Sequence, residues 1–159
     1  MTNFFRNLFG RSRASLKNTL TEAHENISYD FNVIEIWRKE GLKLNNPASR
    51  ESILTTQQKL EFIFPDDFYR FYTQVNGFRD YDMTGEMFSV WPLERIVEEY
   101  ENTGEINFIP FCDYLIDSHR IGYLKNRAGV YKDHDRVNMI ADTFEATMTL
   151  IIRDSTLLY

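Results

Sequence analysis

The chain has little of the material from which disulfide scaffolds, zinc modules and membrane spans are built. Its 159 residues include a single cysteine, Cys112, which excludes an internal disulfide and a cysteine-rich zinc module. No apolar run approaches the roughly 20 residues that cross a bilayer. The stretch from Phe4 to Phe9 is interrupted by Arg6 and Asn7, unlike the apolar region of a signal peptide. These absences predict a cytoplasmic protein.

Groups that carry out catalysis are equally scarce. Of the three histidines, His119 directly follows Ser118 in a predicted strand, where adjacent side chains point to opposite faces and cannot act together. Cys112 lies in an apolar strand, where a free cysteine is typically a small buried hydrophobic residue. Asp133-His134-Asp135 is a short polar turn, whose adjacent side chains cannot readily converge on one ion. We therefore expect no catalytic residue, metal site or cofactor, although an enzyme built from scattered residues stays an open alternative.

Positive charge is in short supply, and it is unevenly distributed. The 18 lysines and arginines face 24 acidic residues, a net charge of −6 that disfavours direct binding of nucleic acid. Residues 1–20 hold four basic and no acidic residues, whereas the rest hold 14 basic and 24 acidic. We predict that residues 1–24 are a basic appendage and that residues 25–159 form a single acidic domain.

The appendage is amphipathic if it is helical. Its apolar side chains then lie on one side and Arg6, Arg13 and Lys17 on the other. Such a helix can bind an anionic membrane surface through residues 4–17, or dock into a partner. We favour the simpler alternatives, in which the apolar side packs on the protein's own domain or Gly10 divides a partly disordered tail.

The remaining chain predicts helices first, strands second and a closing helix. Three helices are expected first: one over 29–40, one from a cap at Ser49 to about Phe62, and one from Pro65 to a stop at Asn76-Gly77. A fourth helix is expected to begin at Pro92, and the closing helix to begin at a capping box, Asp142-x-x-Glu145. Strands are expected over 87–91, 106–112, 119–124, 128–132 and 137–140. This order indicates an α+β domain, with helices packed on one mostly antiparallel sheet of about five strands.

The acidic residues suggest a surface for a partner. Glu94, Glu98 and Glu101 share a face of the helix after Pro92, although like charges at this spacing cost it roughly 0.2–0.5 kcal/mol per pair. The other acidic residues assigned to the same surface are Asp80, Asp82 and Glu86. One interpretation is a solvated face that keeps the protein soluble. The other interpretation is a negative patch that attracts a basic partner protein, and this partner would itself bind or act on nucleic acid.

Several short motifs resemble one known family. The first run reads Phe64-Pro65-Asp66-Asp67-Phe68-Tyr69 and is preceded by Glu61 and followed by Asn76-Gly77-Phe78. Further matches are Trp91-Pro92-Leu93-Glu94-Arg95-Ile96, Ile109-Pro110-Phe111, and Ala141-Asp142-Thr143-Phe144. In this order they resemble the SUKH superfamily, the Smi/Knr-like proteins, over about residues 30–155, with Phe64 in place of the usual leucine.

The resemblance implies an α+β domain without a catalytic centre. Bacterial members of the superfamily are commonly immunity proteins that neutralise toxin domains, many of them nucleases, and fungal members regulate cell-wall assembly as interaction hubs. The expected function is therefore a non-enzymatic module that binds a cognate toxin. The alternative is a housekeeping scaffold, associated with a membrane through its N-terminus. We interpret the signature residues Glu61, Pro65, Asp66, Asn76, Gly77, Trp91 and Asp142 as mainly structural.

Overall fold

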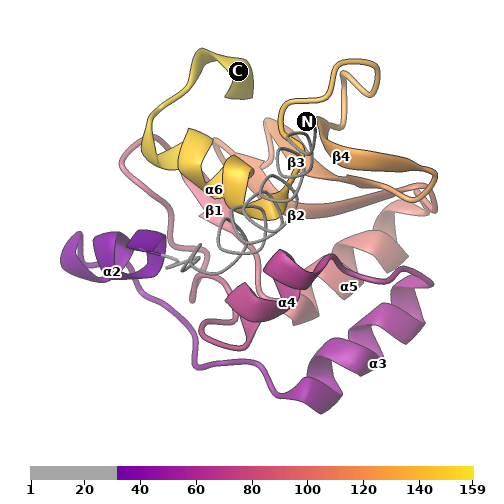
Figure 1. Ribbon diagram of the computed structural model, residues 1–159, viewed down its shortest axis with the longest axis horizontal. Coiled ribbons are helices and arrows are strands. Elements are labelled where there is room, and N and C mark those ends of the chain that lie inside the picture. Colours follow the sequence, from indigo (N-terminus) through magenta and orange to yellow (C-terminus); the bar gives the residue numbers. More distant parts are fainter. Residues whose placement is uncertain (1–31) are drawn as a thin grey trace, which may run out of the picture. The chain divides into compact units, whose positions relative to one another are not determined.

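The computed structural model describes residues 32–159 as helices packed on one antiparallel sheet (Figure 1). The helices are α2 (Asn32–Lys39), α3 (Arg50–Leu60), α4 (Asp66–Tyr72), α5 (Leu93–Thr103), α6 (Phe144–Ile152) and the 3-10 helix η1 (Thr156–Leu158). The strands are β1 (Phe88–Val90), β2 (Phe108–Tyr114), β3 (His119–Leu124) and β4 (Arg127–Lys132). The predicted α+β class is confirmed. The predicted appendage, residues 1–24, lies outside the described residues.

Local capping signals explain where the helices begin. The Ser49 side chain accepts a hydrogen bond from Ser52 N at 3.0 Å, which confirms the predicted cap of α3. Pro65 precedes α4 rather than opening it, because its ψ of 155° is extended. The predicted cap at Asp142 is wrong, because Thr143 accepts the hydrogen bond from Ala146 N and so caps α6.

The sheet has the order β1-β2-β3-β4, and every neighbouring pair is antiparallel. The fifth strand predicted over 137–140 is not formed. The Asp135 side chain accepts hydrogen bonds from the backbone N–H groups of Val137 and Asn138, and so holds this segment in a turn. Two isolated bridges, Val130 with Ala141 and Lys132 with Asp135, are the pairing that β4 makes with the segment that follows it.

Aromatic side chains form the core between the helices and the sheet. The Phe68 ring of α4 lies 6.2 Å from the Phe111 ring of β2, and the Phe144 ring of α6 lies 5.1 Å from it. The Phe111 ring lies 5.0 Å from the Tyr123 ring of β3. Aromatic pairs at this separation are favourable beyond the area that they bury. Within residues 32–159, none of the helices is long and apolar enough to cross a membrane.

Candidate functional site

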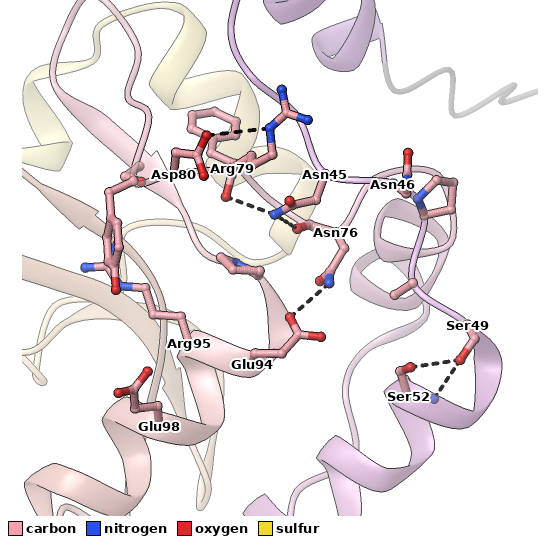
Figure 2. A pocket seen from close by; sticks show the side chains of 16 residues that line it. Asn45, Asn46, Ser49, Ser52, Asn76, Arg79, Asp80, Glu94, Arg95 and Glu98 are labelled. Carbon is pink, nitrogen blue, oxygen red and sulfur yellow. Dashed lines mark hydrogen bonds and ion pairs between the residues drawn. The ribbon is translucent and has the colours of Figure 1, made fainter.

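A polar pocket of about 720 Å³ lies between the start of α3, the segment after Gly77 and the first two turns of α5 (Figure 2). Its charged lining residues are Arg79, Asp80, Glu94, Arg95 and Glu98. Asparagine and serine side chains line much of the remaining wall. The pocket therefore offers charges and hydrogen-bonding groups to a ligand rather than an apolar cavity.

Asn76 holds α5 in place at one side of this pocket. Its Oδ1 accepts a hydrogen bond from Leu93 N at 2.9 Å, at the first turn of α5, where backbone N–H groups have no partner within the helix. Its Nδ2 donates to Glu94 Oε2 at 3.1 Å (Figure 2). One amide side chain thus both caps the helix and orients a carboxylate of the pocket.

Gly77 brings the chain against the junction of β1 and α5. Its φ of 63° lies in the left-handed region, and a Cβ atom there would come within 2.5 Å of the Trp91 carbonyl group. The next residue, Phe78, donates its N–H to Val90 O at 2.7 Å, and the Tyr72 hydroxyl donates to Trp91 O at 2.6 Å. The Asn-Gly motif therefore serves to pack the end of α4 onto β1 and α5.

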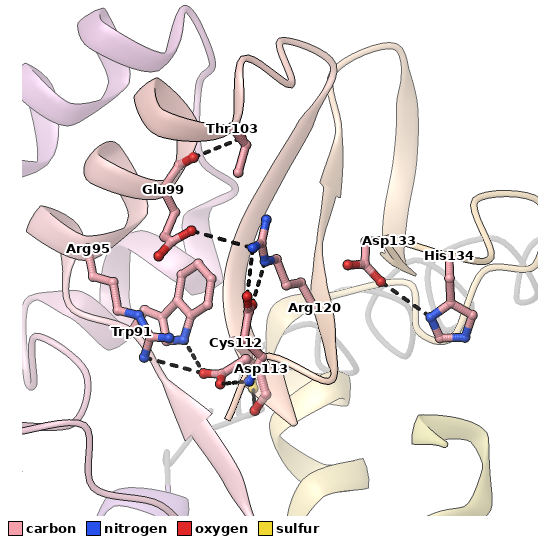
Figure 3. Close-up of polar contacts among 10 residues, drawn as sticks. Trp91, Arg95, Glu99, Thr103, Cys112, Asp113, Arg120, Asp133 and His134 are labelled. Carbon is pink, nitrogen blue, oxygen red and sulfur yellow. Dashed lines mark hydrogen bonds and ion pairs between the residues drawn. The ribbon is translucent and has the colours of Figure 1, made fainter. Parts of the chain in front are cut away.

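A buried charge cluster adjoins the pocket (Figure 3). Asp113 of β2 is 2% exposed and accepts a hydrogen bond from the Trp91 indole N–H. The Arg95 guanidinium lies 3.4 Å from the same carboxylate and stacks 4.1 Å above the Trp91 ring. It also lies 4.9 Å from the ring of Tyr81, which is 69% exposed. Arg95 is thereby held in one position in the pocket wall.

The six acidic residues predicted to face a partner divide between the pocket and its surroundings. Asp80, Glu94 and Glu98 line the pocket, and Glu86 and Glu101 are exposed elsewhere. Asp82 is half-buried, and its carboxylate accepts hydrogen bonds from Lys43 N at 2.7 Å and from Met83 N at 3.1 Å. It therefore fixes the loop before β1 rather than lining the pocket.

The other predicted signature residues lie outside the pocket. Glu61 ends α3 with a φ of 50°, Pro65 directly precedes α4, Asp66 is its first residue, and Asp142 is exposed before α6. Sequence reasoning missed Tyr81, Arg95 and Asp113. Asp113 gave no functional signal because it lies within an otherwise apolar strand, and its partners lie about 20 residues away in the sequence.

The described residues offer little for covalent or metal chemistry. Across residues 32–159, no group of three or more His, Cys, Asp or Glu side chains is arranged to hold a metal ion. Cys112 is buried, as predicted, and burial raises the pKa of its thiol well above the usual value. Burial likewise raises the pKa of Tyr72 well above its usual value. Neither group is poised as a nucleophile at neutral pH.

Fold and pocket together define an α+β module whose motif residues hold helices α4 and α5 against the sheet. Residues 47–149 match the model of the SMI1 / KNR4 family (SUKH-1). The chain belongs to this family, which confirms the resemblance seen in the sequence and is in keeping with a module for protein–protein interaction. No curated protein matches the chain at a significant level.

Proposed function

We propose that this domain is an immunity protein that binds a basic toxin domain and blocks it by covering its active surface. A nuclease is one example of such a toxin domain. The observation that carries the proposal is the convergence of Asp80, Glu94 and Glu98 on one open polar pocket. Inhibition of this kind is steric and electrostatic, so the domain needs no catalytic group. A specific complex would bury roughly 1,200–2,000 Å² of surface.

The pocket supports binding of a protein segment better than binding of a small molecule. Glu98 and Asp80 are exposed at its wall, and Tyr81 presents an exposed ring beside them. Tyrosine and arginine are enriched among the residues that dominate interface energies. Arg95 and Tyr81 would thus serve as anchors, and the carboxylates would attract lysine and arginine side chains of the partner.

The first test is a pull-down with the full chain from the cells that produce it, followed by mass spectrometry. A stoichiometric basic partner that carries a toxin domain, and whose activity is inhibited by the purified chain, supports the proposal. Recovery of several cell-envelope or signalling proteins, none of which is inhibited, contradicts it and favours the regulatory alternative.

The acidic face of α5 is tested by charge reversal. We expect Glu94→Lys, Glu98→Lys and Glu101→Lys together to slow association with the recovered partner about tenfold or more at low salt, because opposite charges steer the encounter. The double variant Glu98→Lys and Glu101→Lys keeps the Asn76–Glu94 hydrogen bond and is expected to act in the same direction. Stopped-flow association rates are the measurement.

A matched control carries the same change in net charge away from α5. It combines Glu40→Lys, Glu61→Lys and Asp142→Lys, three exposed residues that do not line the pocket. Equal association rates for both triple variants would show that net charge alone matters, and would contradict the assignment of the interface to α5.

A further inference from the structure

Strained backbone is concentrated in two loops, and one of them contributes Asp80 and Tyr81 to the pocket wall. Of the eight non-glycine residues with positive φ among residues 32–159, six lie in two loops: Asp80, Tyr81 and Met87 before β1, and Leu115, Ile116 and Asp117 between β2 and β3. Strain of this kind clusters at functional sites. Ile116 is the least expected of the six, because a β-branched side chain at a φ of 51° is a genuine outlier.

The β2–β3 turn is held firmly in its strained conformation. Leu115 N donates to Met87 O at 2.9 Å, and Asp117 N donates to Asp113 Oδ2 at 2.8 Å. The Arg120 guanidinium binds the Asp117 carboxylate through two hydrogen bonds, of 2.6 and 2.8 Å. A turn fixed in this way loses little conformational entropy when a partner binds to it.

This rigid turn holds two apolar side chains in solvent. Ile116 is 75% exposed and Leu115 is 46% exposed. Beside them the Tyr114 ring lies 5.0 Å from the ring of Tyr159, which is itself 46% exposed. The exposed carboxylate Glu86 lies next to Met87, which binds the turn. Leu115 and Ile116 thus form an apolar tip of the turn, and the negative charge of Glu86 lies next to the residue that binds the turn.

The tip and the pocket share one support. The Asp113 carboxylate holds both the turn, through Asp117 N, and Arg95, whose guanidinium stacks near Tyr81 in the pocket wall. The loop before β1 also joins them, because its residues Asp80 and Tyr81 line the pocket and its Met87 accepts the hydrogen bond from Leu115 N. A partner that covers the pocket and extends along this loop would therefore reach the β2–β3 turn. We propose that Leu115 and Ile116 form the apolar anchor of this interface and enter a hydrophobic cleft, bordered by lysines or arginines, on the same basic toxin domain; this inference rests on the proposed function.

The test uses the partner protein recovered with the full chain, purified and immobilised. Ile116→Asn removes the apolar side chain and places at this position a residue that tolerates the left-handed region. The expected result is an increase in the dissociation rate of about tenfold or more. The melting temperature of the free protein is expected to rise by about 2–5 °C, because backbone strain is relieved.

The matched control is Ile63→Asn, the same substitution at an isoleucine that is 83% exposed and has no positive φ. It is expected to leave both the dissociation rate and the melting temperature unchanged.

An unchanged dissociation rate for Ile116→Asn overturns the anchor, and a lower melting temperature shows that Ile116 only stabilises the fold. If Glu98→Lys and Glu101→Lys slow association while Ile116→Asn binds normally, only the anchor fails. If no basic partner is recovered, both proposals fail.

Discussion

At the scale of single residues, Gly77 combines two constraints that are usually separate. Its positive φ disfavours any side chain, and the Trp91 backbone fills the space that a Cβ atom would need. Gly41, after α2, has a φ of 83° but nothing within 4 Å of the same position. Comparison of the two glycines therefore separates backbone strain from steric overlap.

We expect Gly77→Ala to lower the free energy of unfolding by more than about 2 kcal/mol, because strain and overlap add. Gly41→Ala, where only strain applies, should cost about 1 kcal/mol. Urea denaturation of the full chain measures both. Equal losses for the two variants would contradict the close packing of Gly77 on Trp91.

At the scale of elements, one carboxylate joins two helices that lie far apart in the sequence. Asp67 in the first turn of α4 is buried, and its Oδ2 accepts a hydrogen bond from Glu145 N of α6 at 2.9 Å. Its Oδ1 accepts from Phe68 N at 3.0 Å. The start of α6 is therefore capped both by its own Thr143 and by a residue of α4.

Removal of this link is expected to destabilise the fold. Asp67→Ala should lower the free energy of unfolding by about 1–3 kcal/mol, because the partly buried Glu145 N–H and the buried Phe68 N–H both lose their side-chain partner. The control is Asp66→Ala in the same turn, where the exposed carboxylate contributes only about 0.3–1 kcal/mol through the helix dipole. Denaturant midpoints give the comparison, and equal midpoints for the two variants would show that the link to α6 contributes nothing.

At the scale of the whole molecule, the C-terminal segment closes over one end of the sheet. Leu158 is fully buried, and its carbonyl accepts a hydrogen bond from His119 Nε2 at 2.8 Å. Lys132 Nζ donates to Tyr159 O at 2.5 Å, and the Tyr159 ring packs 5.8 Å from Phe88. The last residues of the chain are thus part of the folded domain.

The burial of His119 beneath this segment predicts a dependence of stability on pH. Desolvation lowers the pKa of His119 from its usual 6.5, and the nearby His134 lowers it further, although the hydrogen bond to Leu158 opposes the shift. The unfolded chain then binds the proton more readily, so the stabilisation is fully present above about pH 6.5 and is lost as the pH falls toward the lowered pKa. The urea midpoint should therefore be lower at about pH 5.5 than at about pH 7.5.

His119→Gln isolates this contribution, because glutamine keeps an N–H donor and does not titrate. We expect a smaller loss of stability between the two pH values than in the natural chain. His134→Gln, at an exposed position, serves as the control and should keep most of the pH dependence. An identical pH dependence for His119→Gln and the natural chain would exclude His119 as its source.

Much of the fold could be predicted from the sequence because the relevant signals act over one or two turns of chain. The Ser49 cap and the apolar periodicity of α5 were sufficient to place two helices, and alternation was sufficient for four strands. The helix predicted from Pro65 is also present, but it ends at Tyr72 and not at the predicted stop, Asn76-Gly77. The fifth strand failed for a local reason of the same kind, since Asp135 binds the backbone of 137–138 and competes with strand pairing.

The candidate site depends on contacts that no local pattern encodes. Asn76 caps α5 across 17 residues, and Trp91 meets Asp113 across 22 residues. Each pairing forms only when β1 and β2 align and bring their flanking loops together. The sequence by itself predicted an acidic chain of α+β class, because capping, periodicity and charge are local properties, and its short motifs carried the resemblance to the SMI1 / KNR4 family. Only the tertiary structure decided which carboxylates line the pocket, that Arg95 lies beside them, and that Ile116 is held in solvent, because these depend on long-range packing.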